Sequence, residues 1–303
     1  MNALPPQHPP FDALEAMARQ LEASGRYKIL RQFERNTVVA PTNAATLRWG
    51  IYLDTETTGL SAQKDEIIEL AMIPFQYDEI GQICFVGQPW VRLRQPSKPI
   101  PPEITQVTGI TDAMVAGHVI DPAEVAAFIG PAVIVVAHNA AFDRPFVERF
   151  CESFKLKSWA CSMREVDWAA FGFEGTKLKY LAAEAGFFFA GHRAENDCYA
   201  GIEILSHTLP TGQTALRHML ETARTTTWRI AAVNAPFHHK EALKARGYRW
   251  NDGENLAPKA WWIDVAEDAY HAEMIYLAQE IYGYDPQLSP RRITAFERFS
   301  ERI

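Results

Sequence analysis

Two acidic residues at the end of an apolar segment have a spacing that suits chemistry. Asp54 and Glu56 are separated by one residue, so in a strand both side chains point to the same face. Two carboxylates this close repel each other at neutral pH unless a cation neutralises them, and their hard oxygens suit Mg²⁺ or Mn²⁺. Because acidic pairs are also common at exposed strand ends, the pair predicts a metal site only if further ligands accompany it.

Two later segments supply further groups of the same chemical kind. Asp143 ends the sequence His138-Asn139-Ala140-Ala141-Phe142-Asp143, and His192 stands five residues before Asp197. In the first turn of a helix, Asp143 is equally well explained as a residue that complements the helix dipole. Taken together, four carboxylates and a histidine are what a two-metal phosphodiester hydrolase requires, namely a metal cage and a group that activates water.

Alternating strands and helices must position these residues. The hydrophobic pattern predicts strands over 49–56, 66–77, 83–93 and 132–137, and helices over 104–108, 122–129, 141–154, 178–185 and 194–207. Three strands in a meander, followed by a strand between helices, indicate an α/β fold with a mixed sheet. The acidic residues then lie where strands end and helices begin.

The flanking regions have a different organisation. A proline-rich start precedes a predicted helix over 11–24 and a short strand over 27–30, which together form a small appendage. After Pro210 the pattern predicts a small α+β accessory module, with helices over 211–224, 238–246 and 267–282 and strands at 228–233, Trp250 and Trp261-Trp262. We therefore expect three parts: an N-terminal appendage (1–48), a catalytic domain (49–210) and an accessory module (211–303).

Composition limits the class of protein. The 303 residues are 48% hydrophobic and 22% charged, which excludes a disordered or fibrous chain. The net charge is −7, and residues 51–205 alone carry 12 Lys and Arg against 21 Asp and Glu. Four scattered cysteines form no zinc or disulfide pattern. Without a signal-like start or an apolar run near the ~20 residues of a membrane span, we expect a cytoplasmic protein that makes no membrane contact.

Three of these segments together resemble a known family. Asp54-Thr55-Glu56-Thr57-Thr58-Gly59, the segment 138–143, and His192 followed by Asp197 are similar, in order and interval, to the three motifs of the DEDDh (DnaQ-like) 3′–5′ exonucleases. This family includes the proofreading epsilon subunit of bacterial DNA polymerase III and RNase T. The resemblance covers about residues 51–205, including Thr108-Gly109-Ile110-Thr111. The sister DEDDy class has tyrosine where this chain has Arg193, so the histidine class fits.

The resemblance implies an RNase H-like fold and assigns roles by position. Asp54, Glu56 and Asp197 would hold one Mg²⁺ or Mn²⁺ ion that carries the attacking water. Asp54 would also contact a second ion, with the help of Asp143, and His192 would be the general base.

The resemblance also implies substrate contacts. These would be the backbone of Thr57 and Gly59 at the terminal nucleotide, the side chains of Leu60 and Ile110 at its base, and a pocket shaped by Asn139 and Phe142. For Leu60 and Phe142, core packing is an almost equal alternative.

The expected activity is metal-dependent 3′–5′ hydrolysis at single-stranded or frayed 3′ ends, releasing nucleoside 5′-monophosphates. DNA is preferred because the first motif looks closer to the proofreading and repair branch. An RNA-trimming exoribonuclease is the alternative within enzymes. A nucleic-acid-binding or proofreading subunit that docks onto a polymerase or repair complex is the alternative from another class, and a homodimer remains open.

The accessory module is the basis of a further hypothesis. Residues 211–260 carry eight Lys and Arg against four acids, interleaved with aromatic residues. This pattern suits single-stranded nucleic acid or a partner protein, although most of the tryptophans are expected to form the core of the module.

Overall fold

The larger sheet of the protein is mixed, and it carries the predicted catalytic segments. The computed structural model describes residues 11–34, 46–253 and 258–302. The strand order is β4-β3-β2-β6-β7, and β5 also pairs with β3. These strands are β2 (Arg48–Thr57), β3 (Ile67–Tyr77), β4 (Ile83–Val86), β5 (Trp90–Leu93), β6 (Ile134–Ala137) and β7 (Ser158–Cys161). Since β2 is antiparallel to β3 and parallel to β6, it lies where the sheet changes direction.

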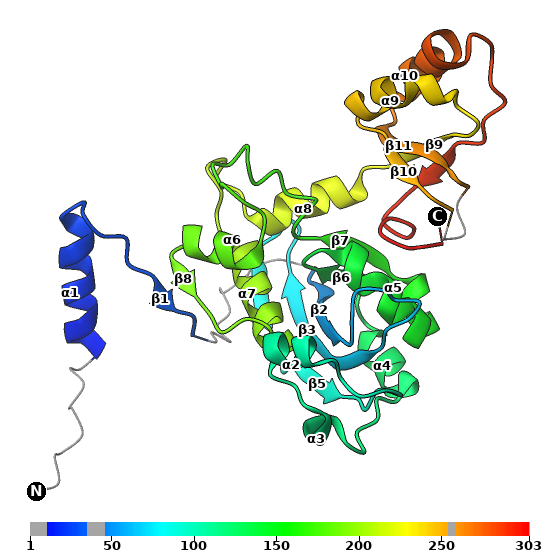
Figure 1. Ribbon diagram of the computed structural model, residues 1–303. Helices are drawn as coiled ribbons and strands as arrows, with labels where there is room; N and C mark the ends of the chain where they lie inside the picture. The colour runs from blue at the N-terminus through cyan, green and yellow to red at the C-terminus, as the bar shows by residue number, and fades with distance from the viewer. Residues whose placement is uncertain (1–10, 35–45, 254–257, 303) are drawn as a thin grey trace, which may run out of the picture.

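Helices cover both faces of this sheet (Figure 1). One face packs on α6 (Leu178–Glu184), α7 (Ala194–Ser206) and α8 (Ala215–Arg224), and the other on α4 (Pro122–Ile129) and α5 (Ala140–Phe150). Two short helices, α2 (Pro102–Thr108) and α3 (Asp112–Val115), lie beside β5. Strand alternation explains the division, because Tyr52 is buried toward α7 whereas Ile51 and Leu53 are buried toward α5. Gly201 lets α7 lie close to β2, since a Cβ there would come within 2.1 Å of the Tyr52 ring.

Two smaller parts complete the described chain. Near the N-terminus, α1 (Phe11–Ala23) stands apart in Figure 1, and β1 (Arg31–Gln32) pairs with β8 (Phe187–Phe188). The second part has an antiparallel sheet in the order β10-β11-β9-β12. Its elements are β9 (Thr227–Ala232), η2 (Phe237–His239), α9 (Lys240–Ala245), β10 (Arg249–Asn251), β11 (Ala260–Ala266), α10 (Tyr270–Tyr276), the π-helix η3 (Leu277–Tyr282) and β12 (Arg291–Ile293). It encloses a separate hydrophobic core.

The predicted α/β class with a mixed, helix-flanked sheet is confirmed, but several boundaries were wrong. The strand expected over 83–93 is two strands, interrupted before Trp90 at a segment that contains Pro89. The strand expected over 27–30 lies at Arg31–Gln32. The helix expected over 141–154 ends at Phe150 and is followed by the 3-10 helix η1 (Glu152–Leu156), and the helix expected from 267 begins at Tyr270.

The two ends of the region after Pro210 pack against the part of the chain that contains the larger sheet. Helix α8 contributes Leu216, Met219 and Leu220 to the same core as α7. After β12, the chain returns to the larger sheet, where the backbone N–H of Trp159 donates to the carbonyl of Ala295 at 2.8 Å. The division into 1–48, 49–210 and 211–303 stays a prediction. Within the described residues, every helix is too short or too polar to span a bilayer.

Candidate metal centre and active site

Three carboxylates meet on the face of β2 that α7 covers. Strand alternation directs Asp54 and Glu56 to this face, as expected, and Asp197 lies in the first turn of α7. Each of these three residues offers one carboxylate oxygen, and the three oxygens all lie within 4.8 Å of one another. Distant parts of the sequence thus bring hard oxygen donors together in the pattern that divalent cations such as Mg²⁺ prefer.

Asp143 reaches the same strand end from the opposite face. It lies in the first turn of α5, and its Oδ1 accepts hydrogen bonds from the backbone N–H of Thr55 at 3.1 Å and from the Thr55 hydroxyl at 2.8 Å. Asp143 is 1% exposed. Its second oxygen, Oδ2, is buried without a hydrogen-bond partner among the residues that the structure describes. An unsatisfied buried carboxylate oxygen is costly, so Oδ2 fits a ligand of a cation or of its water.

The electrostatics of the cluster favour a cation. Burial, followed by the charges of Asp143, Asp197 and Glu56, holds the pKa of Asp54 well above its ordinary value. Burial and the charges of Asp197 and Glu69 raise the pKa of Glu56 to about 8, and burial raises the pKa of Asp143 to about 7. Burial also raises the pKa of Asp197. These raised pKa values mean that the carboxylate forms are disfavoured in the site unless a positive charge compensates them, so the residues present fit a divalent cation.

The two histidines of the motifs have different surroundings. His192 is exposed beside the cluster, and its backbone N–H donates to Asp197 Oδ2 at 2.8 Å. Its backbone φ of 68° lies in the left-handed region, which is uncommon for a residue with a side chain. His138 instead bonds to the Ser162 hydroxyl and the Thr176 carbonyl, and burial lowers its pKa to about 4. His138 therefore connects loops, and only His192 stands where a base is expected.

A fifth carboxylate, Glu69, was not predicted. It is 1% exposed on β3, directly opposite Glu56 in the strand register. It accepts a hydrogen bond from Arg193 Nη2 at 2.7 Å and one from the backbone N–H of Ala194 at 2.9 Å. Glu69 therefore fixes the start of α7, three residues before Asp197. The only sequence signal was an acidic residue inside an otherwise apolar strand.

The residues expected to contact the substrate differ in their exposure. Leu60 is 86% exposed, which leaves it available to a ligand. Ile110 is fully buried with Ile68 and Val115, so its side chain cannot pack against a base as expected. Phe142 packs against Phe146, with ring centroids 5.1 Å apart, which supports the core alternative.

The three remaining expected contacts are held by the protein itself. Thr57 is buried, and its hydroxyl donates to the Gly59 carbonyl at 2.6 Å. A Cβ at Gly59 would lie 2.5 Å from an oxygen of Asp65, so this glycine is explained by the approach of Asp65. Asn139, with a φ of 74°, accepts a hydrogen bond from Arg164 at 3.2 Å.

The basic accessory region is largely engaged in its own contacts. Trp228 and Trp261 pack on the core of the accessory part, whereas Trp250 is 50% exposed. Arg229 pairs with Asp264 at 2.7 Å and stacks 4.1 Å from the centroid of the Trp262 ring. Two of the four tryptophans of this region therefore pack on its core, which is fewer than expected, and a nucleic-acid face stays a hypothesis.

Comparisons with known proteins agree with the site. The profile of a family described as exonuclease matches residues 51–205. The chain is 30% identical to DNA polymerase III subunit epsilon of Treponema pallidum, over 50% of this chain and 73% of that relative. It is also 30% identical to the epsilon subunit of Aquifex aeolicus, over 51% of this chain and 77% of that relative. The similarity to a PolC-type DNA polymerase III of Halalkalibacterium halodurans is 41% over 32% of this chain, but it spans only 6% of that polymerase.

Solved structures of nucleases are also similar. Exonuclease X in complex with 5′ overhanging duplex DNA is 27% identical, with a TM-score of 0.41, over 57% of this chain and 99% of that one. E. coli exonuclease I in complex with a dA16 oligonucleotide is 17% identical, with a TM-score of 0.46, over 72% of this chain and 63% of that one.

Proposed function

Because the chain belongs to the exonuclease family whose profile matches residues 51–205, we propose that it is a metal-dependent 3′–5′ exonuclease acting on single-stranded or frayed 3′ ends of DNA. The products would be nucleoside 5′-monophosphates. The observation that carries the proposal is the convergence of Asp54, Glu56 and Asp197, with oxygens within 4.8 Å, beside an Asp143 oxygen that has no protein partner among the described residues.

The residues of this site divide the tasks. Asp54, Glu56, Asp143 and Asp197 would together hold two divalent cations, Mg²⁺ or Mn²⁺, which would supply charge stabilisation to the attacking and leaving oxygens. His192, exposed at the rim, accepts the proton of the attacking water. Thr55 keeps Asp143 in one orientation through two hydrogen bonds. Leu60, exposed after the first motif, packs against the terminal base.

The names of the relatives support the proposed substrate and partner. The two relatives covered to 73% and 77% of their length are named as epsilon subunits of DNA polymerase III, which favours DNA as substrate and a polymerase or repair complex as partner. The basic residues of the accessory module would then contact the strand or that partner. RNA trimming is the alternative substrate, and a role mainly as a binding subunit is the alternative function.

The direct test uses matched 5′-labelled single-stranded DNA and RNA oligonucleotides with Mg²⁺, Mn²⁺ or EDTA. The proposal predicts a ladder that shortens from the 3′ end of DNA, needs the metal, and forms at least tenfold more slowly on RNA. Faster shortening of RNA would retain the chemistry and refute the substrate. Binding of both strands without cleavage would support the binding subunit instead.

A further inference from the structure

The residue after Asp143 connects the active site to the end of the chain. Arg144 has a side chain that is 0% exposed, next to Trp159, and its Nε donates to Glu148 at 2.8 Å. Its other donors reach backbone carbonyls near the C-terminus: Phe296 at 2.5 Å, Arg298 at 2.6 Å and Ala295 at 3.4 Å. A guanidinium that is fully removed from water needs all of these acceptors.

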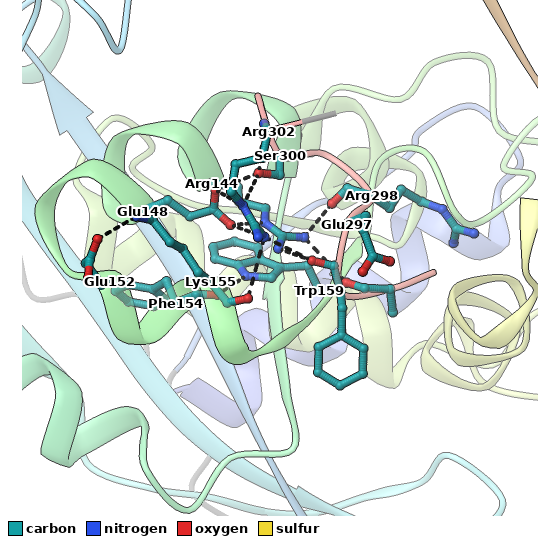
Figure 2. Close-up of polar contacts among 12 residues, drawn as sticks. Arg144, Glu148, Glu152, Phe154, Lys155, Trp159, Glu297, Arg298, Ser300 and Arg302 are labelled. Carbon is teal, nitrogen blue, oxygen red and sulfur yellow. Dashed lines mark hydrogen bonds and ion pairs between the residues drawn. The ribbon is translucent and has the colours of Figure 1, made fainter. Parts of the chain in front are cut away.

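These acceptors belong to the C-terminal tail, defined here as residues 294–302, which follows β12 of the accessory module. Figure 2 shows the tail folded over Arg144 and Glu148. Glu148 accepts hydrogen bonds from the Ser300 hydroxyl at 2.6 Å and from Arg302 Nη2 at 3.1 Å, in addition to the bond from Arg144. Burial alone would raise the pKa of Glu148, but its charged and polar partners hold that pKa below its ordinary value.

A second arginine holds the tail to two other segments. Arg298 pairs with Glu165 at 2.5 Å and donates to the carbonyl of Thr225 at 2.6 Å, just after α8. The Glu165 carboxylate in turn accepts a hydrogen bond from the backbone N–H of Cys161 at the end of β7. The accessory module is therefore fastened at both of its ends, by α8 and by the tail, to the part of the chain that carries the site.

The first turn of α5 has two anchors that point in different directions. Neighbouring helix residues are rotated by about 100°, so Asp143 faces Thr55 on β2 while Arg144 faces the tail. If the tail left, the buried guanidinium would lose three carbonyl acceptors and would have to move toward water. Since Arg144 is joined to Asp143 through one peptide unit, a shift of this helix turn that accompanies the movement would displace Asp143.

We propose that the C-terminal tail is a positioning element of the active site, which holds the α5 turn through Arg144 and thereby sets the place of Asp143. This inference rests on the metal-ligand role of Asp143 in the proposed function. Arg144 is a positioning residue, because its hydrogen bonds go to Glu148 and to the tail and not to the four carboxylates of the proposed metal site.

The test uses full-length variants that loosen this connection in two ways. Arg144→Lys keeps the charge and loses the fork of donors, and Ser300→Ala combined with Arg302→Ala removes the side-chain hydrogen bonds from the tail to Glu148. Arg292→Ala is the matched control, because Arg292 is 62% exposed on β12, with its nearest carboxylate, that of Glu267, 3.8 Å away. Mn²⁺ binding without nucleic acid is measured by electron paramagnetic resonance, and kcat, KM and half-saturating Mg²⁺ on a 5′-labelled DNA strand are measured in parallel.

We expect both loosened variants to need about 10–100-fold more Mn²⁺ and Mg²⁺ for half-saturation, the range found when groups that orient metal ligands are removed. KM for DNA should stay within twofold, and excess metal should restore most of the turnover. Metal affinities equal to those of Arg292→Ala would overturn the inference, as would activity losses that merely follow the unfolded fraction. A Mn²⁺ shift in a protein that cleaves no strand would sustain the positioning role and refute the nuclease proposal.

Discussion

The two carboxylate oxygens of Asp143 have different surroundings and different roles. One of its oxygens is committed to Thr55, and the other is buried with no partner among the described residues. Burial raises its pKa to about 7, so without a cation the carboxyl group is about half protonated at neutral pH. Such an arrangement costs stability in the metal-free chain and becomes favourable once a cation is bound.

Asp143→Asn tests this division of roles. Asparagine keeps an acceptor for Thr55 and removes the charge, so we expect the fold to persist and turnover on single-stranded DNA to fall at least about a thousandfold. The reason is that metal charge stabilisation is worth several kcal/mol, and each 1.36 kcal/mol is tenfold in rate. Asp121→Asn is the control, since Asp121 caps α4 through the N–H of Ala123 at 2.8 Å. Turnover within tenfold of the unchanged protein would contradict the role of Asp143.

At the scale of residues, the sequence predicted that the carboxylates of the motifs converge, because the order and the residue types of the motifs indicate a metal site. It could not predict the use of each side chain. Ile110 was expected at a base and is buried, since its place depends on how α3 packs over β3. Arg144 was not predicted at all, because its carbonyl partners in the tail lie about 150 residues later in the chain.

At the level of elements, the start of α7 is held by β3. The Glu69 carboxylate accepts hydrogen bonds from Arg193 and from the backbone N–H of Ala194. Strand β3, which pairs with β2, therefore fixes the position of the first turn of α7, which carries Asp197. The position that distinguishes the two sister classes of the family, occupied here by Arg193, thus has a structural use in this chain. Gly201 brings the same helix close to Tyr52 on the sheet.

Glu69→Gln is expected to lower turnover about 10–100-fold through misplacement of Asp197. The chain offers a matched control in Glu273, which is likewise buried and pairs with the half-exposed Arg246 at 2.9 Å. Glu273→Gln should cost a similar free energy of unfolding, about 1.5–3 kcal/mol for a hydrogen bond to a charged group, and leave turnover unchanged. Equal turnover in the two variants, measured with saturating Mg²⁺, would show that Glu69 is purely structural.

The sequence predicted those helices and strands whose hydrophobic pattern extends over many residues. Strands β2 and β3 were found almost to the residue, because ten or more residues alternate or are continuously apolar. Strands β7 and β12 were missed, since four and three residues carry too short a pattern. The edge position of β7, completed by Ala295 from the tail, is a tertiary property without a local signal.

For the whole molecule, the sign of the pH dependence follows from the raised pKa values. Glu56 and Asp143 have pKa values of about 8 and about 7 in the folded state, above their ordinary values. The folded chain therefore binds protons more tightly than the unfolded chain. The stability that these protons contribute is complete below the ordinary pKa values and is lost as the pH rises through about 7 to 8.

The central claim is that the four carboxylates form a divalent-cation site, and thermal unfolding of the full-length chain at pH 6 and pH 8.5, in EDTA or in Mg²⁺, tests it most directly. We predict that the EDTA form loses stability between these pH values, that Mg²⁺ restores it at pH 8.5, and that Asp143→Asn reduces both effects. A melting temperature in EDTA that rises with pH, and that does not respond to Mg²⁺, would contradict the account.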